Sequence, residues 1–173
     1  MQWSKLKSLV EARIAGSLRR RVSLHQARYR YTREEVGRVW ISIDGRDAAS
    51  FATGAALPAI RAEAARLMDE QADPGSPAAY GRATSDAVEA VRRAGVYSDQ
   101  DALAELEAYL SLPIEAALAS ESPLQRALAV LDARVGKRRL RALAHAPDVH
   151  PLVRTALALR CEAEAIPFDP PAA

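Results

Sequence analysis

The residues best suited to binding or chemistry in this chain are cations, and they gather in two short stretches. The first, "RRRVSLHQARYRYTR", interleaves Arg28, Arg30 and Arg33 with Tyr29 and Tyr31. Phosphate-seeking charge mixed with stacking rings is what single-stranded nucleic acid favours. Alternation along a strand would place the arginines opposite the tyrosines, which instead favours tyrosines packed beneath a helix and arginines in solvent. Both interpretations stay open at this point.

The second basic stretch, "RVGKRRLR" (residues 134–141), falls at an expected turn between two helices. On a helix that begins near Gly136, Lys137 and Arg141 are four residues apart and Arg138 lies beside them, so the three charges share one side. We expect this side to bind a partner. The full predicted binding set is Arg126, Arg134, Lys137, Arg138, Arg141 and Arg154. Two alternatives are a solubilising helix edge and internal pairing with the acidic segment from Asp99 to Glu107.

These cations are not accompanied by a set of residues typical of an enzyme. The chain lacks a Gly-x-Ser-x-Gly motif, and Cys161 lies one helical turn after Leu157, which predicts a small buried thiol. Three histidines are too few for a typical metal site; His145 and His150 border a loop, where helix capping is the simpler role. We therefore predict a non-enzymatic protein with neither a metal nor a cofactor.

Charge is unevenly distributed over the 173 residues, although the net charge is only +2. Residues 1–50 hold 11 basic and 5 acidic side chains, residues 51–120 hold 5 and 11, and residues 121–173 hold 8 and 6. Such blocks attract each other or an oppositely charged partner. A single cysteine excludes an intramolecular disulfide, and the absence of a long apolar run predicts a soluble, cytoplasmic protein without a membrane span.

The first 71 residues have the pattern of a helix, a three-stranded antiparallel meander and a second helix. Val39, Ile41 and Ile43 alternate with polar residues, and "DG" at positions 44 and 45 predicts a two-residue hairpin turn. The apolar phase of the preceding strand changes, which predicts a bulge near His25 and Gln26. This order resembles that of double-stranded-RNA-binding domains. However, the second helix carries only Arg61 and Arg66 where those domains hold phosphates with a lysine cluster, so the resemblance is one of topology.

The breaker "ADPGSP" (residues 72–77) predicts a linker, followed by a helical lobe over residues 78–167 and a flexible tail over 168–173. Within that lobe "SPLQRALAVL" is echoed 28 residues later by "HPLVRTALAL". Each segment begins with a proline suited to the first turn of a helix, and the pair resembles degenerate HEAT-type repeats. The predicted fold class is thus α+β, with an αβββα lobe followed by an all-α array of short helices.

Four segments of the chain carry a wider resemblance: "WSKLKSLVEARIAGSLRRRVSLHQARYR", "GRVWISIDGRDAASF", "RALAVLDARVGKRRL" and "HPLVRTALALRCEAEAI". They are similar to a family of small bacterial proteins known only as conserved and uncharacterised, and this resemblance implies no activity. We expect a non-enzymatic interaction protein, such as an adaptor, an inhibitor or an immunity-like partner, that binds a protein with an acidic surface. The alternative is a nucleic-acid-binding protein that uses both basic stretches.

Overall fold

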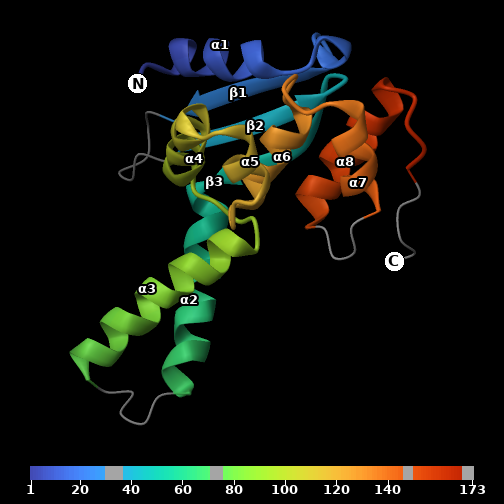
Figure 1. The fold of residues 1–173 in the computed structure, drawn as a ribbon. Coiled ribbons are helices and arrows are strands. Elements are labelled where there is room, and N and C mark those ends of the chain that lie inside the picture. Colours follow the sequence, from blue (N-terminus) through green and yellow to red (C-terminus); the bar gives the residue numbers. More distant parts are fainter. Residues whose placement is uncertain (30–36, 71–75, 146–149, 169–173) are drawn as a thin grey trace.

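The computed structural model describes residues 1–29, 37–70, 76–145 and 150–168 (Figure 1). Three strands follow the first helix, and the later elements of the described residues are all helices, so the predicted α+β class is confirmed. The elements in chain order are α1 (Trp3–Arg13), a short 3-10 helix η1 (Gly16–Leu18), β1 (Val22–Arg28), β2 (Gly37–Ile43), β3 (Arg46–Ala52), α2 (Thr53–Asp69), α3 (Pro77–Arg93), α4 (Asp99–Ser111), α5 (Ile114–Leu118), α6 (Pro123–Leu131), α7 (Lys137–Ala144) and α8 (Pro151–Ala163).

The sheet is an antiparallel meander in the order β1-β2-β3. Asp44 and Gly45 form the β2–β3 turn with φ angles of 50° and 77°, the positive values that a type I′ turn requires. Val39 and Ile41 are buried beneath the helices and Ile43 is partly buried, as the alternation predicted. The predicted hairpin is therefore confirmed in both its turn and its facing.

The bulge lies in a different strand from the predicted one. Residues 22–28 of β1 pair with 37–43 of β2 without interruption, whereas the β2–β3 register shifts between Ile41 and Ser42 and leaves Ala48 as the extra residue. The prediction near His25 and Gln26 is wrong because the inward-facing apolar pattern of β1 simply stops after Leu24. Beyond that residue β1 extends past the core. Its later residues therefore do not have to alternate between buried and exposed positions, and no bulge is required.

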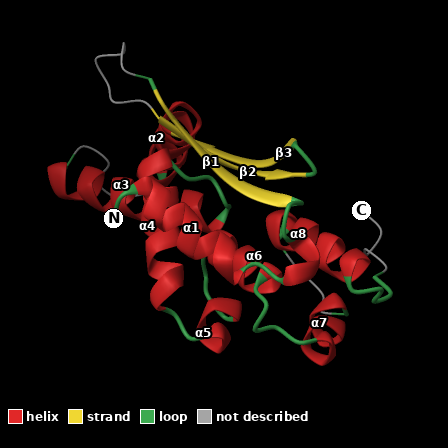
Figure 2. Cartoon of the chain, turned by 90° about the horizontal axis from the view of Figure 1, so that it is seen from above, coloured by secondary structure: helices red, strands yellow, loops and turns green. Residues whose placement is uncertain are grey.

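Helices α1, α4, α6 and α8 lie on one side of the sheet, and no helix of the described residues covers the opposite face, which we call the open face (Figure 2). Helix α1 runs beside β1, where the backbone N–H of Leu24 donates to Glu11 Oε1 at 2.8 Å. The core combines residues of α1, the sheet and the C-terminal helices, so one core spans the predicted linker at 72–77. Among the described residues, no helix is both long and apolar enough to cross a bilayer.

Local capping chemistry sets several helix starts, and the serines at positions 76 and 98 are the sequence signals for two of them. Ser76 accepts a hydrogen bond from the Ala79 N–H, and Ser98 accepts one from the Asp101 N–H. His150 caps α8 by accepting from the Leu152 N–H at 3.1 Å, and its Nε2 lies 3.1 Å from the Ala94 carbonyl oxygen at the end of α3. Cys161 is buried, as predicted, and burial raises the pKa of its thiol.

Helices α6 and α8, the two halves of the 28-residue echo, pack against each other. Leu131 and Leu159 are both buried in the core, at 3% and 6% exposure. Pro123 and Pro151 occupy the first turn of their helices, as the sequence predicted. The contact is what a repeat would produce, while the assignment to HEAT-type repeats stays a prediction.

Helices α2 and α3 form an antiparallel hairpin that projects from the rest of the protein (Figure 1). We call residues 53–70 and 76–93 of this hairpin the arm, and the remaining described residues the body. Ser76 and Pro77, the last two residues of the breaker read as a linker, begin α3 at the tip of the arm; residues 71–75 lie outside the described residues. Helix α3 runs antiparallel to α2 and packs along it.

Candidate interaction surfaces

Arg134 is held in a network at the end of α6. Its guanidinium binds the carboxylate of Asp132, whose side chain is 1% exposed, with contacts of 2.7 and 3.1 Å. The Tyr109 hydroxyl of α4 donates to the same carboxylate at 2.5 Å. Arg13 of α1 stacks over the Tyr109 ring and donates to the carbonyl oxygen of Tyr109 at 3.0 Å. Arg134 thus helps to join three helices.

Electrostatics within this network favour the charged carboxylate. Burial alone would raise the pKa of Asp132, but hydrogen bonds from Arg134 and Tyr109 outweigh burial and lower it below its usual value. Burial and the neighbouring carboxylate raise the pKa of Tyr109, which keeps its hydroxyl protonated as a donor. Arg134 therefore neutralises a buried charge of this chain, and its role is structural.

Lys137 and Arg139 also bind acidic residues of the same chain. Lys137 Nζ lies 3.5 Å from the Glu164 carboxylate beyond α8, and Arg139 of α7 forms an ion pair with Glu115 of α5. The alternative in which this basic cluster pairs with the segment from Asp99 to Glu107 is wrong. In that segment Asp99 accepts from Thr53, Asp101 pairs with Arg92, and Glu107 pairs with the N-terminal amine.

Arg138 and Arg141 differ from the other members of the predicted basic set. Both are exposed on α7, three residues apart. Within the described part of the chain, neither guanidinium has a hydrogen-bond or ion-pair partner. The available part of the predicted basic face is therefore one turn of α7.

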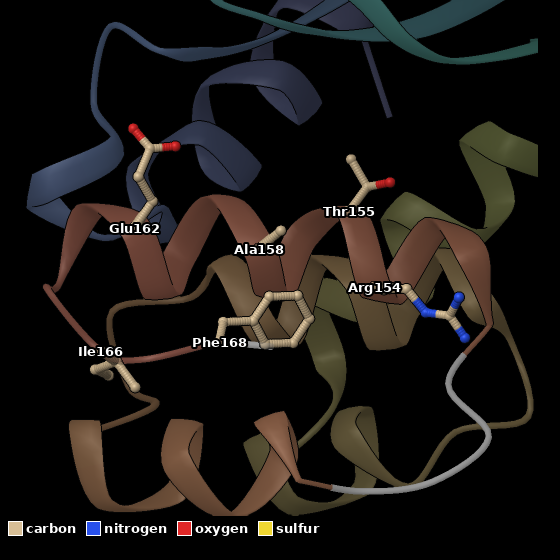
Figure 3. Close-up of a pocket in the computed structure, with 6 residues that line it drawn as sticks. All are labelled: Arg154, Thr155, Ala158, Glu162, Ile166 and Phe168. Carbon is tan, nitrogen blue, oxygen red and sulfur yellow. The ribbon is translucent and has the colours of Figure 1, made fainter. Parts of the chain in front are cut away.

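The remaining two members, Arg126 and Arg154, lie half-buried on different helices. Arg126 of α6 lies near Tyr97, whose pKa is raised by burial and is lowered slightly by this positive charge. Arg154 of α8 borders an open groove of about 460 Å³. Figure 3 shows Arg154 at one end of this groove and Glu162 towards the other, with the Phe168 ring near Ala158 between them. The six predicted residues thus have separate surroundings, and any binding role for them stays a prediction.

The open face of the sheet carries an aromatic and basic cluster that includes residues of two strands. The rings of His25 and Trp40, paired across β1 and β2, stack with centroids 5.0 Å apart. The Arg38 guanidinium lies 4.7 Å from the Trp40 ring centroid and forms an ion pair with Asp47 at 2.5 Å. His25 Nε2 is 2.8 Å from the Ser42 hydroxyl. The indole therefore already has two stacking neighbours in this chain.

Of the basic and aromatic strand predicted to bind nucleic acid, the structure describes Arg28 and Tyr29. Both are exposed, Tyr29 at 52%, at the end of β1. The expectation that the tyrosines pack beneath a helix is therefore wrong for Tyr29, because β1 has left the core before this residue. Arg30, Tyr31 and Arg33 lie outside the described residues.

The arm is a further surface that the sequence interpretation missed. Each of its helices has 17 residues, about 25 Å at the usual helical rise. The buried positions along the contact are small residues, namely Ala56 and Ala64 on α2 and Ala79, Ala83, Ala87 and Val91 on α3. The sequence did carry a signal for the arm. Small residues four apart, at positions 79, 83, 87 and 91, predict a closely packed helix face.

Apolar side chains follow this stripe on one side of the arm. Leu57 comes one residue after Ala56, and Tyr80 comes one residue after Ala79, so each projects about 100° around its helix from the contact. Because the helices are antiparallel and of the same hand, both residues project from the same side of the hairpin. Leu57 is 37% exposed and Tyr80 is 63% exposed. We call this surface the arm strip: Leu57, Arg61, Ala65 and Met68 on α2 with Tyr80, Thr84, Val88 and Arg92 on α3.

The fold thus defines a small α+β protein with a one-sided three-stranded sheet and a projecting helical arm. The chain belongs to the SF0329 protein family, whose model matches residues 2–161 and so includes the sheet, the arm and the helical body. This confirms the predicted membership of an uncharacterised family; the bacterial origin stays a prediction. No curated protein and no solved structure matches the chain.

Proposed function

We propose that this protein is a non-enzymatic protein-interaction module and that the arm is its main binding element. The observation that supports the proposal is that the arm is long, whereas the side chains packed between its two helices are small. Two helices of 17 residues are held together mainly by alanines, while Leu57 and Tyr80 remain exposed beside that contact. Burying such side chains against a partner yields roughly 25 cal/mol per Å² of apolar surface.

Protein interfaces draw most of their energy from a few aromatic and aliphatic residues at their centre. Tyr80 combines a large apolar ring with a hydroxyl that remains wet, which is why tyrosine is enriched at interfaces. A partner that covers Tyr80 and Leu57 would also add a layer to a helix pair that has little core of its own. Binding and arm stability would therefore be coupled.

Photo-crosslinking from the arm tests this proposal. A photoreactive phenylalanine at position 80 should form a covalent adduct with a protein, and Leu57→Glu in the same chain should abolish that adduct. Leu9, an exposed leucine of α1 at 42%, provides the matched control, since Leu9→Glu should leave the adduct unchanged. No adduct at position 80, or an adduct that survives Leu57→Glu, would contradict the proposal.

Nucleic-acid binding is a second candidate, favoured by the open sheet face. His25, Trp40 and Arg38 gather on that face, and Arg28 and Tyr29 lie at the end of β1. A single-stranded oligonucleotide titrated at several salt concentrations tests it, because phosphate contacts make affinity fall steeply as salt rises. Arg28→Glu should then weaken binding. Affinity that does not change with salt would exclude this mode.

Within the predicted basic set, Arg138 and Arg141 on α7 are the pair that would contact the acidic protein partner expected from the sequence. The double variant Arg138→Glu and Arg141→Glu should abolish capture of such a partner. The crosslink from position 80 should persist in the same variant, which separates an α7 interface from an arm interface.

A further inference from the structure

The arrangement of side chains in the arm strip indicates what kind of partner the arm binds. This inference rests on the proposed function of the arm. Leu57 and Met68 lie on either side of the middle of the α2 part of the strip, and Tyr80 and Val88 lie on either side of Thr84 in the α3 part. The two helices have equal length and run antiparallel, so both midpoints fall at the same level of the arm. The larger apolar side chains of the strip are therefore placed symmetrically about its centre, whereas Arg92 lies outside this symmetry at the end of α3.

We propose that the arm strip binds the arm strip of a second copy of this chain, related by a two-fold axis across the middle of the arm. This axis places Leu57 of one copy against Met68 of the other, and Tyr80 against Val88. Each apolar side chain then meets an apolar side chain, as a self-complementary interface requires. The four helices form an antiparallel bundle in which the strip is interior.

The shape of the molecule selects the direction in which the arms pair. The body is much wider than the arm, and the arm projects from it (Figure 1). Two arms that pointed the same way would bring two bodies side by side before the strips could meet along their length. Opposite directions place the bodies at the two ends of the bundle and leave the strips free to pack.

Charge is balanced over the arm as a whole, whereas the charged residues of the strip itself are two arginines. Residues 53–70 hold two arginines and three acidic side chains, whereas residues 76–93 hold three arginines and two acidic side chains. The arm is thus neutral overall, in a chain whose first 50 residues are strongly basic. Of the two charged residues in the strip, Arg92 is already paired with Glu89 and Asp101, so Arg61 is the like charge that each copy brings to the interface.

The expected interface is modest in size. An arm about 25 Å long and two helix diameters wide, about 20 Å, has a footprint of about 500 Å². Two such footprints total about 1,000 Å², close to the lower limit for a specific interface. We therefore expect a reversible dimer, with dissociation in the micromolar range, that sedimentation velocity resolves between about 1 and 100 µM protein.

Sedimentation of surface variants provides the first test. The wild-type chain should pass from monomer to dimer over this range, and Tyr80→Glu should remain a monomer throughout. Leu9→Glu, which changes an exposed leucine outside the arm, should dimerise like the wild type. Arg61 lies near the proposed axis and would face its own copy, so Arg61→Ala should shift the transition to lower concentration. Circular dichroism checks that each variant keeps its helix content.

A cysteine near the axis provides the second test. Thr84→Cys should form a disulfide-linked dimer under mild oxidation, because the two copies of this residue meet across the axis. Ser85→Cys on the same helix is the matched control and should not, since it projects away from the strip. The native Cys161 is buried and does not contribute.

A wild-type chain that stays monomeric at 100 µM, with no Thr84→Cys dimer, would overturn the self-pairing. The photo-crosslink from position 80 separates this failure from failure of the proposed function. An adduct with a different protein retains an arm interface and excludes the second copy as its partner. An adduct between two copies supports both proposals.

Discussion

The body and the arm are built from the same helix-forming residues, yet they are stabilised in different ways. The body buries large side chains, among them Tyr97, Tyr109, Leu106 and Leu124, at 1% exposure or less. The arm buries alanines, and its contact does not extend into the main core cluster. At roughly 25 cal/mol per Å², an alanine contributes far less burial energy than a leucine or a tyrosine. The arm therefore has the weaker internal packing.

Ion pairs distinguish the body from α2, whereas the end of α3 is joined to the body by Arg92 with Asp101 and Arg93 with Glu121. In the body, Arg134 and Tyr109 hold the buried Asp132, and Arg21 joins Asp44 of the hairpin turn to Glu162 of α8. On α2, Arg66 pairs with Glu63 and Glu70, each within four residues of it. Pairs distant in sequence restrain tertiary structure, whereas local pairs at a helix surface add only a few tenths of a kcal/mol.

The largest expected effect comes from opening a cavity in the body. Leu131 packs between α6 and its neighbours at 3% exposure, so Leu131→Ala should lower the free energy of unfolding by about 2–5 kcal/mol. Leu9→Ala on the exposed side of α1 should change it by less than about 0.5 kcal/mol. Chemical denaturation measures both values. A loss below about 0.5 kcal/mol at Leu131 would show that α6 is not part of the stable core.

Overpacking the arm should have a smaller and local effect. Ala83 is 0% exposed between α2 and α3, and Ala83→Leu forces the two helices apart at a cost of about 1–3 kcal/mol. Hydrogen exchange should then accelerate in residues 53–70 and 76–93, while exchange in α4 and α6 stays as in the wild type. Equal acceleration in the body would show that the two regions form one cooperative unit.

The buried carboxylate of Asp132 predicts that the difference in stability between the wild type and an Asp132→Asn variant depends on pH. Asp132→Asn removes the charge that Arg134 neutralises and should cost about 1 kcal/mol at neutral pH. Because the folded pKa of Asp132 is lowered, its contribution is complete above the ordinary carboxyl pKa and is lost as pH falls through the folded value. The stability gap between wild type and variant should therefore narrow towards pH 3. A constant gap would exclude this titration as its cause.

The smallest expected effect is on α7. Arg138→Glu and Arg141→Glu should each change the free energy of unfolding by less than about 0.5 kcal/mol, since both side chains are exposed and neither has a partner in the described part of the chain. Arg134→Glu places a second carboxylate beside Asp132 and should destabilise the protein much more. Similar thermal unfolding of the Arg134 and Arg138 variants would contradict the roles assigned to these two arginines.

Several parts of the fold followed from local sequence signals. Alternation of Val39 and Ile41 with the "DG" dipeptide predicted the hairpin, and Ser76, Ser98 and Pro123 predicted helix starts. These signals suffice because a type I′ turn or an N-cap depends on dihedral angles and hydrogen bonds within about four residues.

The candidate surfaces were less predictable, because they depend on contacts between distant residues. Lys137 meets Glu164 and Arg139 meets Glu115 across 27 and 24 positions, so the cluster at 134–141 looked freer in the sequence than it is. The open sheet face likewise depends on pairing His25 with Trp40. A local sequence pattern does not predict which distant acidic residue or aromatic ring a basic or aromatic side chain will contact.

The arm shows most clearly where sequence information ends. The sequence by itself determined two amphipathic helices separated by a breaker at 72–77, since periodicity, Ser76 and Pro77 are local properties. Only the tertiary structure decided that α3 returns along α2 and that both project from the body, because a turn of that length permits either packing onto the core or packing onto the preceding helix. The alanine stripes favour the second outcome, since only small side chains allow two helix backbones to approach so closely.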